Sequence, residues 1–229
     1  RKNRLLHYQA SHDPLTGLIN RREFEERLER AILHARIHSA THALLYMDLD
    51  RFKIINDTCG HAAGDELLQQ LGRLMLGPVR KRDTLGRLGG DEFGMLLENC
   101  PLDKAIRIAD NLQSAIENFR FSWQGENFTL GISIGVVPVD QATSDLAAAM
   151  RAADAACYIA KEAGRNRVQV ADTGSRSLRE QHGQIQWLSR LNRALEEDRF
   201  HLYFQPIVPC DGNRRQSRHI EILLRLIDD

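Results

Sequence analysis

The stretch RLGGDEFGMLL, residues 87–97, places Gly89 and Gly90 between two short apolar runs. Two glycines in this position are typical of a tight β-hairpin turn. Asp91 and Glu92 follow the turn directly, and the chain then becomes apolar again. A turn needs the glycines, but it has no need of an acid pair beside a buried strand. The stretch is therefore either a solvated hairpin tip or the edge of a functional site.

The composition is that of an ordinary globular chain. The 229 residues are 42% hydrophobic, and 31 basic residues balance 31 acidic ones, which points to neither nucleic acid nor a membrane surface as a partner. The four cysteines lack ligand-like spacing, which favours reduced thiols in the cytoplasm over a zinc site. Without a signal peptide or a long apolar run, we expect no membrane contact from this segment. We interpret it as part of a longer protein, which an upstream segment could anchor to a membrane.

Hydrophobic patterning predicts one α/β (α+β) domain. Asn20 and Glu23 form a capping pattern that opens a helix through Ile32. Strands are expected at 42–48, 84–88, 92–97, 127–139 and 167–170, with further helices from about 61, at 106–116 and at 144–163. The order is β-α-β-β-α-β with extra helices, which predicts a ferredoxin-like, palm-type core.

That topology brings distant carboxylates together. The first and third strands of such a core are antiparallel neighbours at the centre of the sheet. Asp48 and Asp50 at the end of one strand should therefore meet Asp91 and Glu92 at the start of the other. Clustered carboxylates repel one another unless cations neutralise them, and all-oxygen ligands suit Mg²⁺ or Mn²⁺. Acids from two strands that hold such ions are a recurring device for phosphoryl transfer.

Two further features favour a site over a hairpin tip. The connection at 48–68 is long and polar where a plain loop would be short. Lys161 and Arg165 lie four residues apart at a predicted helix end and could cradle phosphate oxygens. Taken alone, that pair is typical of a solvated helix terminus. The chain has no P-loop motif.

We divide the chain into four parts. Residues 1–12 are predicted to form a connector helix, 13–172 the first domain, 173–198 an amphipathic linker helix, and 199–229 the truncated start of a second domain. The last part holds two strand-like runs, FHLYFQPIV and HIEILLRLI, which have no predicted sheet partners except each other.

Five motifs occur in order along the first domain: DPLTGLINRR at 13–22, DLDRFKIINDTCGHAAGDELL at 48–68, RLGGDEF at 87–93, SIGVV at 133–137 and ADAACYIAKEAGRNRV at 153–168. With them the chain resembles the GGDEF family of diguanylate cyclases over residues 13–172. The resemblance implies that two GTP molecules, one held by each domain of a homodimer, condense to cyclic di-GMP with release of two pyrophosphates.

The resemblance also implies roles for individual residues. Asp48 and Asp91 would bind Mg²⁺ through carboxylates and Leu49 through its carbonyl, while Asp91 and Glu92 would be catalytic. The GTP-binding residues would be Asn56 and Asp65 at the guanine edge, His61 beside the nucleotide, and Phe52, Lys53, Lys161 and Arg165 at the phosphates. Arg80 and Asp83 match an R-x-x-D product-inhibition site for cyclic di-GMP; the alternative is that RKRD at 80–83 is a charged strand entry, but its position five residues before Gly89 favours the site.

The tail resembles the start of an EAL domain, the cyclic di-GMP phosphodiesterase family. Glu221 would be a metal ligand of that second site, and Gln205 would lie near its substrate. Two alternatives remain beside an active cyclase. One is a silent GTP- or cyclic di-GMP-binding module that controls an adjoining phosphodiesterase. The other, a different palm-type nucleotidyl cyclase, is disfavoured because Asn56 and Asp65 match the guanine-reading positions.

Overall fold

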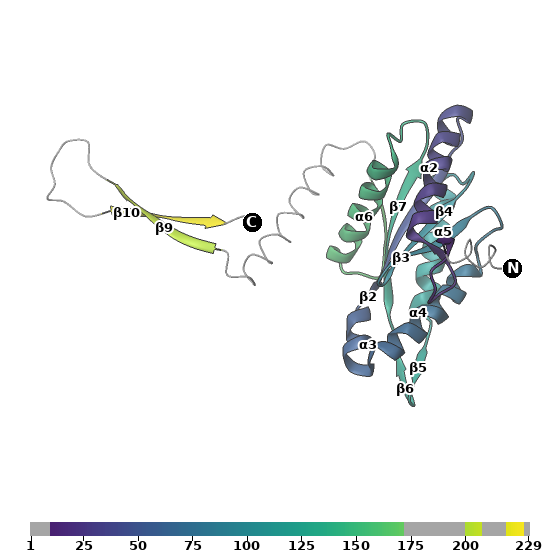
Figure 1. Ribbon diagram of the computed structural model, residues 1–229, viewed down its shortest axis with the longest axis horizontal. Coiled ribbons are helices and arrows are strands. Elements are labelled where there is room, and N and C mark those ends of the chain that lie inside the picture. The colour runs from purple at the N-terminus through teal and green to yellow at the C-terminus, as the bar shows by residue number, and fades with distance from the viewer. Residues whose placement is uncertain (1–9, 172–199, 208–218, 227–229) are drawn as a thin grey trace. The chain divides into compact units, whose positions relative to one another are not determined.

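The computed structural model describes residues 10–171, 200–207 and 219–226. The chain divides into two units, Arg1–Gly174 and Ser175–Asp229 (Figure 1). The predicted linker helix and most of the predicted connector helix lie outside the described residues. No helix in the described ranges is both long and apolar enough to cross a bilayer.

The first unit is built on a six-stranded mixed sheet with the order β1-β3-β4-β2-β7-β8. The strands are β1 (Ile19–Asn20), β2 (His42–Asp50), β3 (Thr84–Gly89), β4 (Glu92–Leu97), β7 (Gly131–Val139) and β8 (Val168–Val170). The β2 strand runs antiparallel to both β4 and β7. The predicted central pairing of the strands at 42–48 and 92–97 is therefore confirmed.

The alternation of side chains along β2 divides the core into two layers. Leu45, Met47 and Leu49 pack with α4 (His61–Leu76) and α5 (Leu102–Glu117). Leu44 and Tyr46 point to the other face and pack with α2 (Arg21–His38) and α6 (Leu146–Glu162). Both faces of the strand are buried, which explains why its sequence is a continuous apolar run rather than an alternating one.

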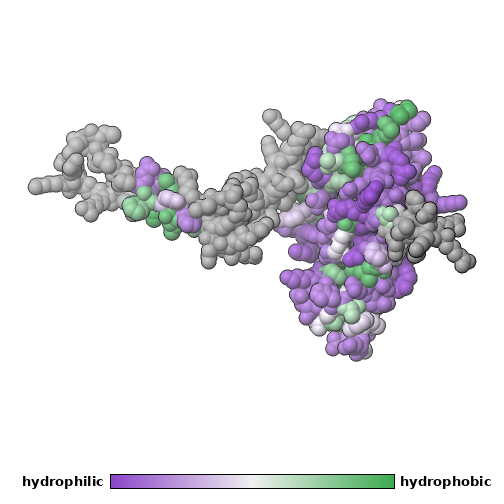
Figure 2. All heavy atoms as spheres, viewed as in Figure 1, coloured by the Kyte–Doolittle hydropathy of each residue, from purple (hydrophilic) through white to green (hydrophobic). Residues whose placement is uncertain are grey.

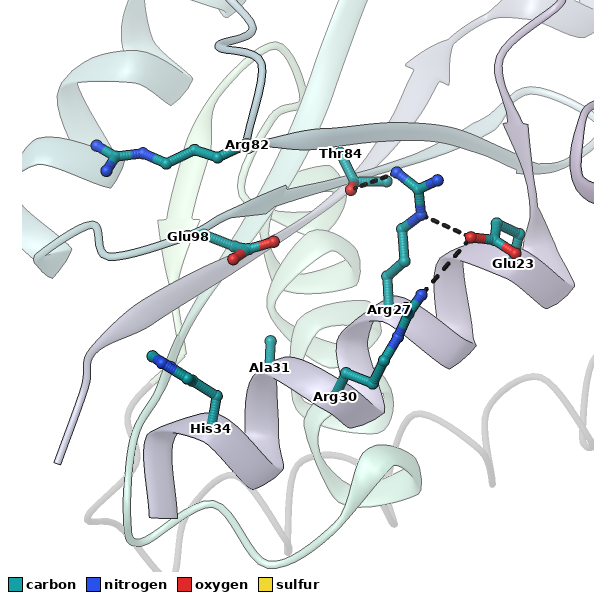
Figure 3. Close-up of a pocket in the computed structure, with 8 residues that line it drawn as sticks. All are labelled: Glu23, Arg27, Arg30, Ala31, His34, Arg82, Thr84 and Glu98. Atoms are coloured by element: carbon teal, nitrogen blue, oxygen red, sulfur yellow. Dashed lines mark hydrogen bonds and ion pairs between the residues drawn. The ribbon is translucent and has the colours of Figure 1, made fainter. Parts of the chain in front are cut away.

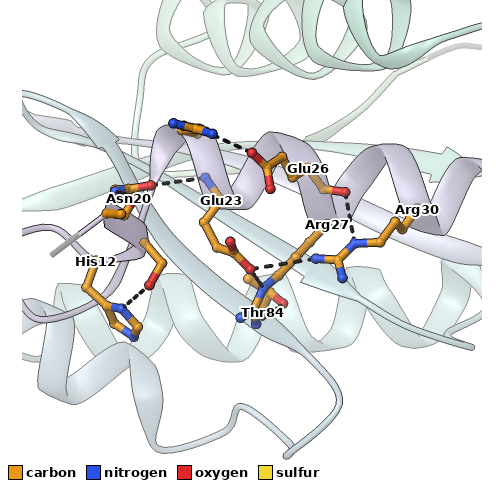
Figure 4. Close-up of polar contacts among 10 residues, drawn as sticks. His12, Asn20, Glu23, Glu26, Arg27, Arg30 and Thr84 are labelled. Carbon is orange, nitrogen blue, oxygen red and sulfur yellow. Dashed lines mark hydrogen bonds and ion pairs between the residues drawn. The ribbon is translucent and has the colours of Figure 1, made fainter. Parts of the chain in front are cut away.

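The start of α2 agrees with the predicted capping pattern. The Asn20 side chain accepts a hydrogen bond from the Glu23 amide at 3.0 Å (Figure 4). The Glu23 carboxylate turns along the helix and accepts from Arg27 at 2.8 Å. The cap fixes where α2 begins, directly after β1.

Two predicted elements differ from the structure. The polar connection after β2 contains the short helix α3 (Phe52–Cys59), which buries only Phe52 and Ile55 and so carries little periodic signal. The expected strand at 127–139 is interrupted at residues 129 and 130. Its first part, β6 (Glu126–Phe128), pairs with β5 (Phe121–Trp123) in a separate hairpin. The β7 strand begins at Gly131 because this residue pairs with Asp50, the last residue of β2.

The second unit contains an antiparallel pair, β9 (Phe200–Ile207) and β10 (His219–Leu226). Gln205 pairs with Glu221 across the two strands. Large apolar side chains, including Leu202, Phe204 and Ile222, are exposed (Figure 2). In the described part of the chain no third strand joins this pair.

Candidate functional site

The register of the sheet places the predicted acids at one edge. Asp48 is the direct partner of Glu92 across β2 and β4. The amide of Leu49 donates to the carbonyl oxygen of Asp91 at 3.3 Å, which ties the end of β2 to the Gly89–Gly90 turn. Asp48 therefore lies beside Asp91 and Glu92, although more than forty residues separate it from them in sequence.

The turn itself is braced by two arginines that the sequence did not single out. Gly90 has a φ of 50°, which favours glycine. Arg87 donates to the Gly90 carbonyl from Nε and Nη2, at 3.0 and 2.8 Å, and its Nη1 pairs with Asp13 at 3.2 Å. Arg21 donates to the Leu88 carbonyl at 2.8 Å and to the Glu92 carboxylate at 3.2 Å. These bonds hold the acid pair in one position relative to β2.

Asp50 is separate from the acidic edge, contrary to expectation. Its carboxylate is 5% exposed. It accepts hydrogen bonds from the Ser133 hydroxyl and from the Asn166 amide, both at 2.8 Å. Both oxygens are engaged within the protein, so Asp50 fastens β2 to the turn after α6.

Asp48 is the carboxylate with the most perturbed environment. Its pKa is raised to about 6, mainly by burial and also by the nearby charges of Asp91 and Glu92, against the opposing effect of Lys161. The Lys161 ammonium lies 2.6 Å from Asp48 Oδ2. Burial alone would lower the pKa of Lys161, but the bond to Asp48 raises it. A buried acid beside other acids favours a cation partner.

The donor chemistry at this edge fits a hard divalent ion. Carboxylates and a backbone carbonyl are the ligands that Mg²⁺ prefers, and Mg²⁺ usually takes only one or two carboxylates together with substrate phosphates. Within the described residues, no three His, Cys, Asp or Glu side chains are grouped to hold a metal. The ligands predicted from the sequence, Asp48, Asp91 and the carbonyl of Leu49, include only two carboxylates.

The predicted guanine-binding residues lie on two helices in close contact. Asn56 belongs to α3, and His61 and Asp65 belong to α4. A Cβ at Gly64 would collide with the Asn56 side-chain oxygen, so this glycine lets the two helices approach. The approach brings Asn56 beside the helical turn that carries Asp65.

The predicted phosphate-binding residues divide between two places. Lys161 contacts Asp48, whereas Arg165 lies in the turn after α6 and lines a neighbouring cavity. Phe52 and Lys53 begin α3, and the Phe52 ring is buried, so only its backbone could face a ligand.

Arg80 and Asp83 form a turn before β3. One Asp83 oxygen accepts from the Arg80 amide at 3.1 Å, and the other accepts from the Glu98 amide at 3.2 Å. A cavity of about 410 Å³ adjoins this turn and is lined by Arg82, Thr84, Glu98 and residues of α2 (Figure 3). Arg27 and Arg30 of that helix both pair with Glu23.

The sequence profile described as diguanylate cyclase, GGDEF domain, matches residues 10–167. The chain belongs to the GGDEF family. Probable diguanylate cyclase DgcE of Escherichia coli is 46% identical over 73% of this chain and 15% of its own length. Cyclic di-GMP phosphodiesterase PdeB of Shewanella oneidensis is 34% identical over 96% of this chain and 25% of its own length. The chain thus spans a quarter or less of these two curated relatives.

A solved GGDEF domain has the same architecture. The GGDEF-only form of TpbB (YfiN) from Pseudomonas aeruginosa aligns with a TM-score of 0.69 and 36% identity, covering 77% of this chain and 99% of that one. The mixed α/β fold predicted from the sequence is therefore confirmed for the first unit.

Proposed function

We propose that this GGDEF domain is an active diguanylate cyclase, which condenses two GTP molecules to cyclic di-GMP and releases two pyrophosphates. The observation that carries the proposal is the pairing of Asp48 with Glu92 beside the braced Gly89–Gly90 turn. Enzymes of the family are generally metal-dependent. The intact acid set favours turnover over silent binding.

Some residues of the chain bind the ion and the phosphates, and others accept the proton. Asp48, Asp91 and the Leu49 carbonyl would hold Mg²⁺ or Mn²⁺, which would neutralise phosphate charge and make the 3′-hydroxyl more acidic. Glu92, with Asp91, accepts the hydroxyl proton. Lys161, which contacts Asp48 in this structure, would bind phosphate oxygens of GTP.

Residues of α3 and α4 select the substrate by recognising its base. Asn56 and Asp65 read the guanine edge, because an amide and a carboxylate together complement the donors and acceptors of that base. His61 lies beside the nucleotide, and the backbone at Phe52 and Lys53, with Arg165, holds the phosphates. Each protomer holds one GTP, so two domains must face each other as a homodimer. A GTP-consuming domain with reduced thiols acts in the cytoplasm.

The direct test is synthesis of cyclic di-GMP from GTP and Mg²⁺ by the whole chain. We expect Asp91→Ala to lower the rate by more than about 100-fold, because it removes a metal ligand. Its thermal unfolding should match wild type, since the side chain is only partly buried at the sheet edge. The matched control is Asp103→Ala, an exposed acid on α5 that pairs with Arg107. Equal rates in the Asp91→Ala variant and wild type would remove Asp91 from the site.

A second role is regulation of an adjoining phosphodiesterase. The match to PdeB extends over 96% of the chain and so passes beyond the cyclase domain. We propose that the β9–β10 pair opens an EAL domain, with Gln205 and Glu221 on neighbouring strands of its site. Phosphodiesterase activity of the parent protein, measured with and without GTP, separates this role from synthesis. An unchanged rate on addition of GTP would argue against regulation.

A further inference from the structure

A cavity of about 370 Å³ adjoins the proposed phosphate site and is rich in arginine. Three arginine residues line it from three separate segments of the chain. Arg51 comes from the residue before α3, Arg120 from the segment after α5, and Arg165 from the turn after α6. The carboxylates among its lining residues are those of Asp50 and Glu117.

The floor of the cavity is fixed by Asp50. Its two oxygens bind the Ser133 hydroxyl and the Asn166 amide. A Cβ at Gly131 would lie 2.8 Å from the Asp50 carboxylate and 2.9 Å from Asn166 Cβ, so glycine permits this tight packing. Asp50 thereby holds the chain positions of Arg51 and Arg165 at a fixed separation.

The arginine side chains have unused N–H donors, whereas the backbone amides of the turn after α6 are already bonded. The amides of Gly164, Arg165 and Asn166 already bind Lys161 O, Ala160 O and Asp50. Among the described residues, no carboxylate pairs with any of the three guanidinium groups, and only Nη1 of Arg120 is bonded, to the carbonyls of Glu117 and Phe119. A guanidinium has five N–H donors, so most remain available.

The backbone conformation of Arg51 also supports a binding role for this residue. Its φ of 63° lies in the left-handed region, which is costly for a residue with a side chain. Such strain persists where the surrounding structure or function requires it. Here it lies between Asp50, which forms the floor, and Phe52, whose backbone faces the proposed phosphates.

We propose that Arg51 and Arg120, together with Arg165, form a site for a polyphosphate anion. Its ligand is the β,γ-diphosphate of bound GTP or the free pyrophosphate that the reaction releases. Guanidinium groups bind phosphate oxygens in bidentate pairs, so three arginines suit a ligand with several phosphate oxygens. The proposal rests on the proposed cyclase function, since that reaction supplies the ligand.

The test is calorimetric titration of the whole chain with inorganic pyrophosphate, in the absence of GTP. We expect the double variant Arg51→Gln and Arg120→Gln to weaken binding by about tenfold or more, because each lost charge-assisted bond weakens binding substantially. The matched control is Arg107→Gln, an exposed arginine on α5, which should bind like wild type. Replacing both residues by lysine should give an intermediate affinity. This variant keeps the positive charges but loses the bidentate geometry of the guanidinium groups, so it distinguishes the two contributions.

Steady-state kinetics with GTP distinguishes the two sources of the ligand. A raised KM for GTP in the glutamine variant assigns the site to the bound triphosphate. An unchanged KM with weaker product inhibition by pyrophosphate assigns it to the leaving group. Wild-type affinity for pyrophosphate and unchanged kinetics in the double variant would overturn the proposal. Absence of cyclic di-GMP synthesis by a wild-type chain that still binds pyrophosphate at these arginines would instead overturn the cyclase assignment.

Discussion

At the scale of single residues, Asp48 shows how a proposed binding residue can oppose stability. Its pKa in the folded chain is about 6, above the ordinary value of 3.8. The folded state therefore binds its proton more tightly than the unfolded state, and ionisation of Asp48 costs stability as the pH rises through this window. Lys161 offsets part of that cost at 2.6 Å. Such a carboxylate fits a role in binding better than a role in holding the fold.

Arg80 differs from Asp83 in how its side chain is used. Both Asp83 oxygens are bonded to backbone amides, whereas among the described residues no hydrogen bond or ion pair engages the Arg80 guanidinium. We expect Arg80→Ala to relieve inhibition by cyclic di-GMP by about tenfold, because it removes one charged phosphate contact. The initial rate should not change. Rates measured against added cyclic di-GMP check this, with Arg73→Ala, an arginine exposed on α4, as the control. Inhibition equal to wild type would favour the plain charged-turn interpretation.

His42 should make stability fall on mild acidification. It is 1% exposed, its Nδ1 accepts from the Asn99 amide at 2.9 Å, and its Nε2 lies 3.2 Å from His34 Nδ1. Burial lowers its pKa below 6.5, the neighbouring His34 lowers it further, and Glu98 partly opposes this. The unfolded chain thus takes up the proton first, so stability is complete above about pH 6.5 and declines below it.

The measurement is the free energy of unfolding in urea at a series of pH values. His42→Asn keeps an acceptor for the Asn99 amide but cannot titrate, so its stability should fall less steeply between pH 7 and 5. Identical pH dependence in the two proteins would show that His42 does not contribute to the slope.

At the scale of elements, the sequence predicted most of what periodicity and turn chemistry determine. The apolar run of β2, the hairpin at Gly89–Gly90 and the cap at Asn20 were all confirmed. The short helix α3 was missed because two buried side chains leave too little pattern to detect. Asp48 and Asp50 lie on the same face of β2, so the sequence could not distinguish their roles. What distinguishes them is a tertiary contact, the hydrogen bond from the Asn166 amide to Asp50. The braces from Arg21 and Arg87 likewise depend on tertiary contacts that local sequence does not show.

Because β7 and α6 are in close contact at Gly135, we expect one added methyl group there to destabilise the fold strongly. A Cβ at Gly135 would collide with the Ala153 carbonyl and crowd the Cys157 amide, and neither backbone atom can move without shifting α6. We expect Gly135→Ala to lower the free energy of unfolding by about 3 kcal/mol. The control is Gly72→Ala in α4, where the nearest atoms belong to side chains at 3.4 Å or more and helix propensity favours alanine. Chemical denaturation of both variants checks this. If Gly135→Ala lowers the free energy of unfolding no more than the control does, β7 and α6 can move apart at little cost in free energy.

At the scale of the whole molecule, the first unit supplies a complete set of proposed contacts for one GTP only. In the described residues Asp48, Asp91 and Glu92 meet at one place on the sheet edge, and each of them is partly exposed. Two phosphodiester bonds must nevertheless form, each between one GTP hydroxyl and the α-phosphate of the other. The described part of a single unit offers one such edge, so we expect the proposed synthesis to need two protomers.

Association should therefore control the rate. At protein concentrations below the dimer dissociation constant, we expect cyclic di-GMP formation to rise with the square of the protein concentration. Excess Asp91→Ala protein should suppress wild-type synthesis, because a mixed dimer has one site that can activate a hydroxyl and so stops after the first bond, as a linear dinucleotide. Excess Asp103→Ala protein should not suppress it, since both sites of that mixed dimer stay intact. Initial rates across a dilution series, with chromatography of linear and cyclic products, measure both effects. A rate proportional to wild-type concentration and indifferent to the Asp91→Ala partner would show that one protomer acts alone.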